Sequence, residues 1–183
     1  MSKLDAKAVV NIRSCLAEHL PHLRRYARAL IRNSDLADDL VQDALERALR
    51  NDGQFRPGSD LRAWLFAIMH NLHVNQTLRS RARGPHVAID DETISDAAFA
   101  VGANQTAGME IRDLDLALQR LPAEQREVVL LVGLEELSYA ETASALGIPI
   151  GTVMSRLARG RERLRAVLVP NDMPGTAKLA RVG

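Results

Sequence analysis

The sequence predicts an all-α fold of two small helical domains joined by a flexible linker. Aromatic residues make up only 3% of the 183 residues, and Ala, Leu and Arg dominate, which favours helices over sheets. Apolar residues recur at three- and four-residue steps in several segments, whereas no segment alternates with period two over a convincing length. The length allows two small domains. We predict them at residues 9–83 and 109–169, with a linker at 84–108 and a disordered tail at 170–183.

The first predicted domain begins with an amphipathic segment that contains Leu23 and Ala27 and ends near Asn33. Ser34 or Asp35 is expected to cap the next helix. One face of this helix is predicted to be apolar: Leu36, Leu40, Val41, Ala44, Leu45, Ala48 and Leu49. A polar loop over 51–60 follows, and Asp60 is expected to cap a third helix. The inward residues of that helix are predicted to be Leu61, Trp64, Leu65, Ile68, Met69 and Leu72.

Helical periodicity resumes after the linker with Leu114, Leu118 and Leu121, and Pro122 is expected to start a further helix. A helix-turn-helix then follows from Leu137 to Leu164. Ser138 and Glu141 have the spacing of a capping box. Gly147 lies where a helix commonly ends in a left-handed residue, and Pro149 suits the start of the next helix.

The last predicted helix has two distinct faces. Its buried stripe is predicted to contain Val153, Leu157, Gly160, Leu164 and Leu168. Five arginines lie between Arg156 and Arg165, against the single acid Glu162. A solvated arginine-rich helix that closes an ordinary bundle is the alternative. Because the capping box, the glycine turn and the basic face occur together, the sequence favours binding in a DNA major groove.

The net charge of +1 does not by itself indicate a nucleic-acid partner, but the charges are segregated. Acids cluster at 35–46, while Arg79, Arg81 and Arg83 join the arginines of the last helix as basic groups. Different faces are therefore expected to meet different partners. Cys15 is the only cysteine, which excludes an intrachain disulfide and favours a reducing compartment. Since neither a signal peptide nor a membrane span is apparent, we expect a cytoplasmic protein.

An enzymatic function is not expected. His19 and His22 are three residues apart, as are His70 and His73, but no cysteine or acid completes a metal set at a recognisable spacing. The sequence contains neither a nucleophile elbow nor a phosphate-binding glycine loop. We therefore predict no catalytic residue, no metal and no cofactor.

Three motifs in this order resemble bacterial RNA polymerase sigma factors of the extracytoplasmic-function (ECF) group. DLADDLVQDALERAL resembles the region 2 helix that docks on the clamp helices of the polymerase β′ subunit, and FRPGSDLRAWLFAIMHN resembles the segment that reads and opens the −10 element. LPAEQREVVLL and LSYAETASALGIPIGTVMSRLARGRERL together resemble region 4, which reads the −35 element. The stretch LPAEQREVVLLVGLEELSY also resembles the general-stress branch of this group.

The resemblance implies a role for each surface. The residues implied in binding core polymerase are Asp38, Asp39, Gln42, Asp43 and Glu46. Those implied at the −10 element are Asn51, Asp52, Gly53, Gln54, Asn71, Asn75, Gln76 and Arg79. Those implied at the −35 element are Thr152, Met154, Ser155, Arg156, Ala158, Arg159, Arg161 and Arg163.

Two points of detail qualify these roles. Trp64 and Phe66 could stack on bases, although Trp64 is expected to belong to the core because it lies on the apolar stripe. Met154 departs from the family pattern, since family members commonly carry Lys or Arg there. A thioether cannot make arginine's bidentate contact with guanine, so contact with a thymine methyl is the alternative.

The resemblance implies three partners: core RNA polymerase, through the β′ clamp helices and the β flap, promoter DNA and an anti-sigma factor. Two other classes of protein are alternatives. A free-standing helix-turn-helix regulator would need a dimer surface or a ligand-binding domain, and residues 21–83 resemble neither. A sigma mimic that sequesters an anti-sigma factor would be expected to carry a receiver domain, for which the residues after Leu168 are too few.

Overall fold

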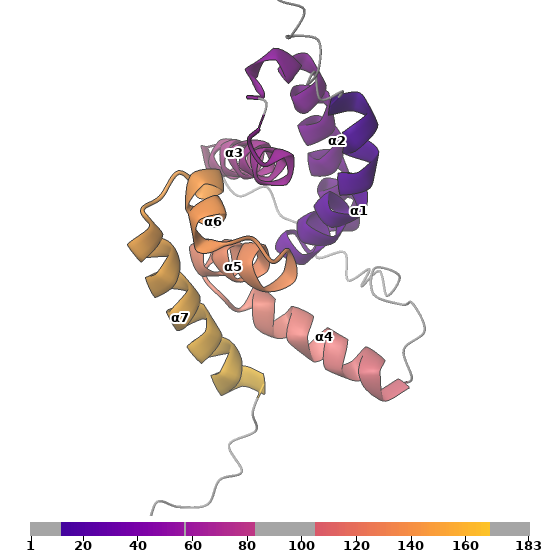
Figure 1. The fold of residues 1–183 in the computed structure, drawn as a ribbon. Helices are drawn as coiled ribbons and strands as arrows, with labels where there is room; N and C mark the ends of the chain where they lie inside the picture. Colours follow the sequence, from indigo (N-terminus) through magenta and orange to yellow (C-terminus); the bar gives the residue numbers. More distant parts are fainter. Residues whose placement is uncertain (1–11, 57, 83–104, 169–183) are drawn as a thin grey trace, which may run out of the picture.

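The computed structural model describes residues 12–56, 58–82 and 105–168, and these form an all-helical structure of two packed units. Helices α1 to α3 make the N-terminal unit and helices α4 to α7 the C-terminal unit, and the two lie against each other (Figure 1). The predicted all-α class is confirmed. No described helix is both long and apolar enough to cross a membrane.

In the N-terminal unit, α1 (Ile12–Leu30) and α2 (Ser34–Arg50) pack against α3 (Leu61–Ala82). A 3-10 turn, Asp52–Gln54, lies in the loop between α2 and α3. Asp60 caps α3 as predicted, because its Oδ1 accepts hydrogen bonds from the backbone N–H groups of Arg62 at 2.7 Å and Ala63 at 3.2 Å. The largest fully buried rings of this unit, Tyr26 and Phe66, meet edge to face with centroids 5.1 Å apart.

Three predictions for this unit are wrong in detail. The cap of α2 is Asn33, whose Oδ1 accepts from the N–H of Leu36 at 2.9 Å, one residue before the predicted caps. Leu36 and Leu49 are 57% and 38% exposed and do not belong to the buried face. Ala37 is buried in place of Leu36, because it lies three and four residues before the buried Leu40 and Val41 and therefore shares their face of α2. Phe66 is buried and cannot stack on a base.

The C-terminal unit contains α4 (Gln105–Gln119), α5 (Ala123–Val129), α6 (Tyr139–Leu146) and α7 (Ile150–Leu168). A π-helical turn, Leu130–Leu134, extends α5 before the chain turns into α6. Helix α4 starts inside the predicted linker, of which residues 84–104 lie outside the described part of the chain, as does the predicted tail at 170–183. Val153, Leu157 and Gly160 are buried as predicted, but Leu168 is 39% exposed at the end of α7.

Gly160 allows α7 to approach α5 closely. A Cβ atom at this position would lie 2.7 Å from Cγ2 of Val129, which is closer than packed carbon atoms tolerate. We expect Gly160→Ala to lower the free energy of unfolding by about 1–3 kcal/mol in urea denaturation, because α7 or Val129 must shift. Gly151→Ala in the same helix meets no atom within 4 Å and is the matched control. Equal losses for the two variants would contradict close packing at Gly160.

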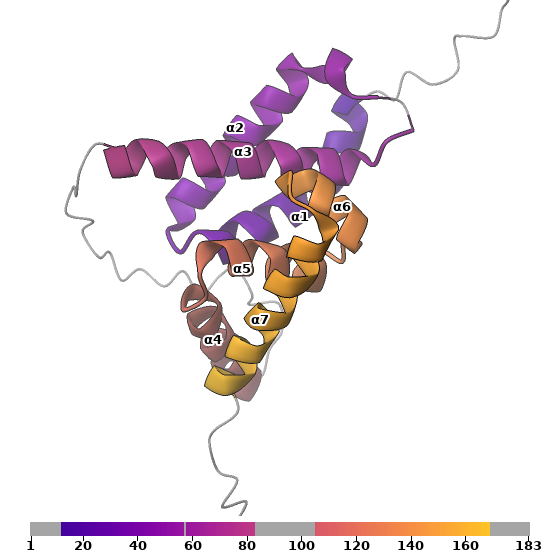
Figure 2. The same ribbon diagram turned by 90° about the vertical axis from the view of Figure 1, so that its left-hand side faces the viewer.

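The two units share one hydrophobic cluster, and polar contacts between them add to it. Figure 2 shows α3 passing across the C-terminal unit beside α6, and α3 and α6 are in direct contact. Helix α1 contacts both α4 and the π-helical turn. Gln119 and Arg126 of the C-terminal unit donate hydrogen bonds to the last carbonyls of α1, those of Ala29 at 3.2 Å and Leu30 at 3.1 Å. The end of α1 is therefore capped from the other unit.

Candidate nucleic-acid interface

Helices α6 and α7 form a helix-turn-helix with the predicted local geometry. Ser138 and Glu141 make a reciprocal capping box, with an Oγ contact of 3.2 Å and an Oε2 contact of 2.7 Å to the partner N–H groups. Gly147 ends α6 with φ at +63°, a left-handed conformation that glycine adopts without strain. The turn brings Pro149 to the start of α7, where its carbonyl accepts hydrogen bonds from Thr152 and Val153. These predictions for the turn are confirmed.

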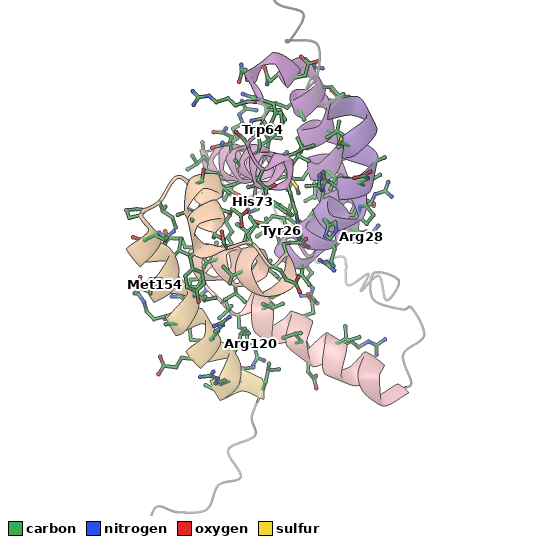
Figure 3. All side chains as sticks on the ribbon, in the orientation of Figure 1. Tyr26, Arg28, Trp64, His73, Arg120 and Met154 are labelled. Atoms are coloured by element: carbon green, nitrogen blue, oxygen red, sulfur yellow. The ribbon has the colours of Figure 1, made fainter. Side chains whose placement is uncertain are left out.

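The polar side of α7 is open to solvent. Arg159, Arg161 and Arg163 are exposed, as is Ala158. Met154 is 53% exposed and lies on the side of α7 that faces away from the rest of the molecule (Figure 3). A long apolar side chain exposed among arginines is available to a partner. The helix thus offers a basic surface with one central apolar contact.

Several residues predicted to contact DNA are engaged within the protein. The Ser155 hydroxyl donates to the Thr152 carbonyl at 3.1 Å, and Arg159 donates to the Ser155 carbonyl at 3.2 Å and to its Oγ at 3.3 Å. Arg156 pairs with Glu124 of α5 at 2.6 Å. A contact with DNA by Arg156 must therefore compete with this ion pair, in which Glu124 is largely exposed and easily rehydrated.

The loop predicted for the −10 element lies beside α3, since Asn51 and Leu72 line the same groove. Asp52, Gly53, Gln54, Asn71, Asn75 and Arg79 are exposed. Gln54 donates to Oδ1 of Asn51 at 3.5 Å, and Gln76 donates to Oδ2 of Asp43 at 3.2 Å. Beside them is a shallow groove lined by Asp43, Glu46, Arg47, Arg50, Asn51 and Leu72.

Trp64 supports this loop. It is partly buried against the core and packs on Phe55, with ring centroids 5.4 Å apart. Because Phe55 follows the 3-10 turn directly, this contact holds the loop against α3. The expectation that Trp64 is a core residue holds, since it packs on the hydrophobic cluster.

The acidic residues of α2 form an exposed face. Asp38, Asp39, Gln42, Asp43 and Glu46 are all exposed. Asp38 lies 3.4 Å from Arg28 of α1, and Glu46 lies 3.0 Å from Arg50 one turn along the helix. Exposed pairs of this kind stabilise little and leave the carboxylates available to a partner. This face lies on the N-terminal unit, whereas the basic face lies on the C-terminal unit (Figure 1).

Sequence reasoning missed the polar residues between the two units. Glu135 is fully buried and is held by His22, Arg25 and Arg62. Glu127 is also buried, and its Oε2 lies 3.2 Å from Nδ1 of His70 without hydrogen-bond geometry. No sequence motif identifies these residues, because a glutamate is ordinarily solvated.

Burial at this interface also shifts pKa values. Desolvation raises the pKa of Tyr26, and the nearby charges of Glu127 and Glu135 raise it further. Desolvation lowers the pKa of His73, which lies between α3 and the C-terminal unit in Figure 3. The side chains between the units are therefore in a low-dielectric environment, unlike the solvated faces of α2 and α7.

Fold and site together define a two-unit helical DNA-binding protein with an acidic face on one unit and a helix-turn-helix on the other. Comparison with known families agrees with this class. Residues 16–70 match the sigma2 domain of PhyR, and residues 111–164 match sigma-70 region 4. The ECF RNA polymerase sigma factor EcfG of Rhodopseudomonas palustris is 40% identical over 162 residues, covering 86% of this chain and 85% of EcfG. SigM of Mycobacterium tuberculosis is 38% identical over 151 residues, covering 82% of this chain and 73% of SigM.

Solved structures give the same result. The sigma factor RpoE of Bartonella quintana, in complex with the anti-sigma factor NepR, matches with a TM-score of 0.72 at 36% identity, over 85% of this chain and 95% of RpoE. CnrH, in complex with the cytosolic domain of CnrY, matches with a TM-score of 0.61 at 26% identity over 86% of each chain. The chain belongs to the ECF family of RNA polymerase sigma factors. It is a sigma factor, and the alternatives of a free-standing regulator or a sigma mimic are not favoured.

Proposed function

We propose that this sigma factor binds core RNA polymerase through the acidic face of α2 and reads the −35 element with α7. The separation of charge between the two units carries this proposal. The acids of α2 suit a basic protein surface such as the β′ clamp helices, because complementary charge steers and orients association. The arginines of α7 suit the phosphates that flank a major groove.

At the −35 element, the residues of α7 that we propose to contact DNA divide by chemistry. Arg156, Arg161 and Arg163 have the reach and charge for phosphate contacts, and the Thr152 hydroxyl can donate a hydrogen bond to a phosphate. Met154, Ser155, Ala158 and Arg159 are the proposed base-reading residues. The exposure of Met154 supports direct contact with DNA, and its thioether suits the methyl group of thymine.

A substitution at Met154 tests the proposed reading of bases. We expect Met154→Arg to favour guanine over thymine by about 10-fold at one −35 position, since a bidentate arginine–guanine contact contributes about 1–3 kcal/mol. Glu162→Gln is the control, because it changes the charge of α7 by the same amount on an exposed position of the same helix. The base preference of both variants is measured by their binding to a library of −35 sequences. An unchanged preference in Met154→Arg would exclude Met154 from base contact.

At the −10 element, we propose that the loop over 51–54 captures an extruded base and that α3 follows the single strand. The exposed side-chain amides of Asn71 and Asn75 can form hydrogen bonds with base edges, and Arg79 can pair with a phosphate. The groove beside Asn51 supports this assignment, because a flipped base needs a polar recess. Gln76 would have to release Asp43 before it contacts DNA.

We further propose an anti-sigma factor as the regulator, a role in a general stress response, the β flap as a second contact on polymerase and a cytoplasmic location. RpoE of Bartonella quintana was solved with the anti-sigma factor NepR, and CnrH with part of CnrY. The similarity to both supports an anti-sigma factor as a partner of this chain. The motif LPAEQREVVLLVGLEELSY supports the general-stress branch.

Reconstituted transcription tests the proposed function. The purified chain is added to core polymerase with a library of promoters, and both binding to core and run-off transcripts are measured. We expect binding and initiation from a subset of promoters. Failure to bind core would contradict the proposal, and binding without initiation from any promoter would favour an antagonist.

A further inference from the structure

The carboxylate of Glu135 belongs to the C-terminal unit, yet its partners among the described residues all come from the N-terminal unit. Nε of Arg25 donates to Oε1 at 2.9 Å, and Nη2 of Arg62 donates to Oε2 at 2.8 Å. Nδ1 of His22 lies 3.0 Å from the same Oε2. Arg25 also donates to the Leu134 carbonyl at 2.9 Å. We call these four residues, His22, Arg25, Arg62 and Glu135, the Glu135 cluster.

We propose that His22, Arg25 and Arg62 form a carboxylate-binding site on the N-terminal unit, that Glu135 occupies it in the closed chain, and that this contact controls the separation of the two units. The inference rests on the proposed function for its biological consequence but not for its geometry. The Glu135 side chain has no exposed surface, while those of His22 and Arg25 are about two-fifths exposed. The three cationic or polar groups are thus at the rim of the interface and the carboxylate is at its centre.

The physical chemistry of the cluster makes closure reversible. A buried carboxylate is stable only while it is paired, so losing any one partner is costly in the closed state. When the units separate, water solvates Glu135 and the arginines alike, which offsets part of the cost of breaking these ion pairs. The same interface buries Nε of Arg62 and the hydroxyl of Tyr26 without a hydrogen-bond partner among the described residues. These unsatisfied atoms further weaken closure.

Separation matters because the promoter elements are far apart. The −35 and −10 elements are about 25 base pairs apart by their positions, which corresponds to ~85 Å of B-form DNA. A compact chain of this length has a radius of gyration of about 16 Å. The two units in contact therefore cannot reach both elements at once. The 22 residues between Ala82 and Gln105 could span at most ~75 Å, which permits a much wider separation of the units.

Energy transfer between two dyes tests the proposal in the full chain. Cys15 is replaced by serine, and labels are attached to cysteines introduced at the exposed positions Asp35 of α2 and Ser144 of α6. We expect Glu135→Gln to lower the ratio of closed to open chains by about tenfold or more. Glu162→Gln removes the same charge from an exposed position of α7 outside the cluster and is the matched control.

Arg62→Gln removes a partner of Glu135 from the N-terminal unit and should open the chain as well. If Glu135→Gln fails to fold by circular dichroism, Arg62→Gln decides the question alone. An unchanged transfer efficiency in the folded variants, or an equal change in Glu162→Gln, would overturn the proposal. Transcription with core polymerase is measured in parallel. If the variants open but neither they nor the parent chain supports transcription, the proposed function is refuted. The carboxylate-binding site is then still supported.

Discussion

Replacement of Arg126 by methionine is expected to lower the free energy of unfolding by about 3 kcal/mol or more, because several buried carbonyl groups lose their donor at once. The Arg126 guanidinium donates five hydrogen bonds, at distances between 2.7 and 3.1 Å. Three of the acceptors are the carbonyls of Leu118, Gln119 and Leu121, where α4 ends and the chain turns into α5. A further acceptor is the Leu30 carbonyl at the end of α1.

Urea denaturation of the full chain measures this loss. Methionine keeps the apolar stem of the side chain, so the change isolates the guanidinium group. Arg120→Met is the control, since Arg120 is close in sequence and exposed. A loss of similar size in the two variants would mean that Arg126 does not organise this turn. A structural role for Arg126 also means that its charge, unlike those of α7, is not available to DNA.

Charge reversal at the centre of the acidic face should have the largest effect on function. We expect Asp39→Arg to weaken binding to core polymerase by about 100-fold, because a like-charge contact replaces an attractive one. Asp39 is exposed on α2, so the substitution should leave the fold unchanged. Binding is measured by competition with a labelled parent chain, and folding by circular dichroism.

Glu18→Arg on α1 is the matched control, because it makes the same change of charge at an exposed position outside the acidic face. We expect it to bind core polymerase like the parent chain. If both variants bind normally, the acidic face is a solvated surface and polymerase docks elsewhere. If both bind weakly, the effect is one of overall charge rather than of a docking site.

Local sequence patterns were sufficient for most of the helices and for the helix-turn-helix. The capping box at Ser138 and the left-handed Gly147 depend on residues within one turn of the chain, so the sequence alone identifies them. The cap of α2 was misplaced by one residue, since Asn33, Ser34 and Asp35 are all able to cap. The buried face predicted for α2 is also imprecise, because leucines at both ends of an amphipathic helix can be exposed.

The candidate surfaces on α2 and α7 could be predicted because charge segregation is a property of residue order. Whether each residue is free could not be predicted. Arg156 is paired with Glu124 and Gln76 with Asp43, and both contacts join residues from different helices. Phe66 shows the same limit. From the sequence its ring could belong to the core or stack on a base, and the structure places it against Tyr26.

The sequence by itself determined the helical class, the helix-turn-helix and the separation of acidic from basic faces, because each of these depends on periodicity or short-range order. Only the tertiary structure decided how the two units meet. Glu135 lies 73 residues from Arg62 and 110 from Arg25 along the chain. A carboxylate so far from its partners in sequence gives no local signal, and its burial becomes apparent only when both units are folded and packed together.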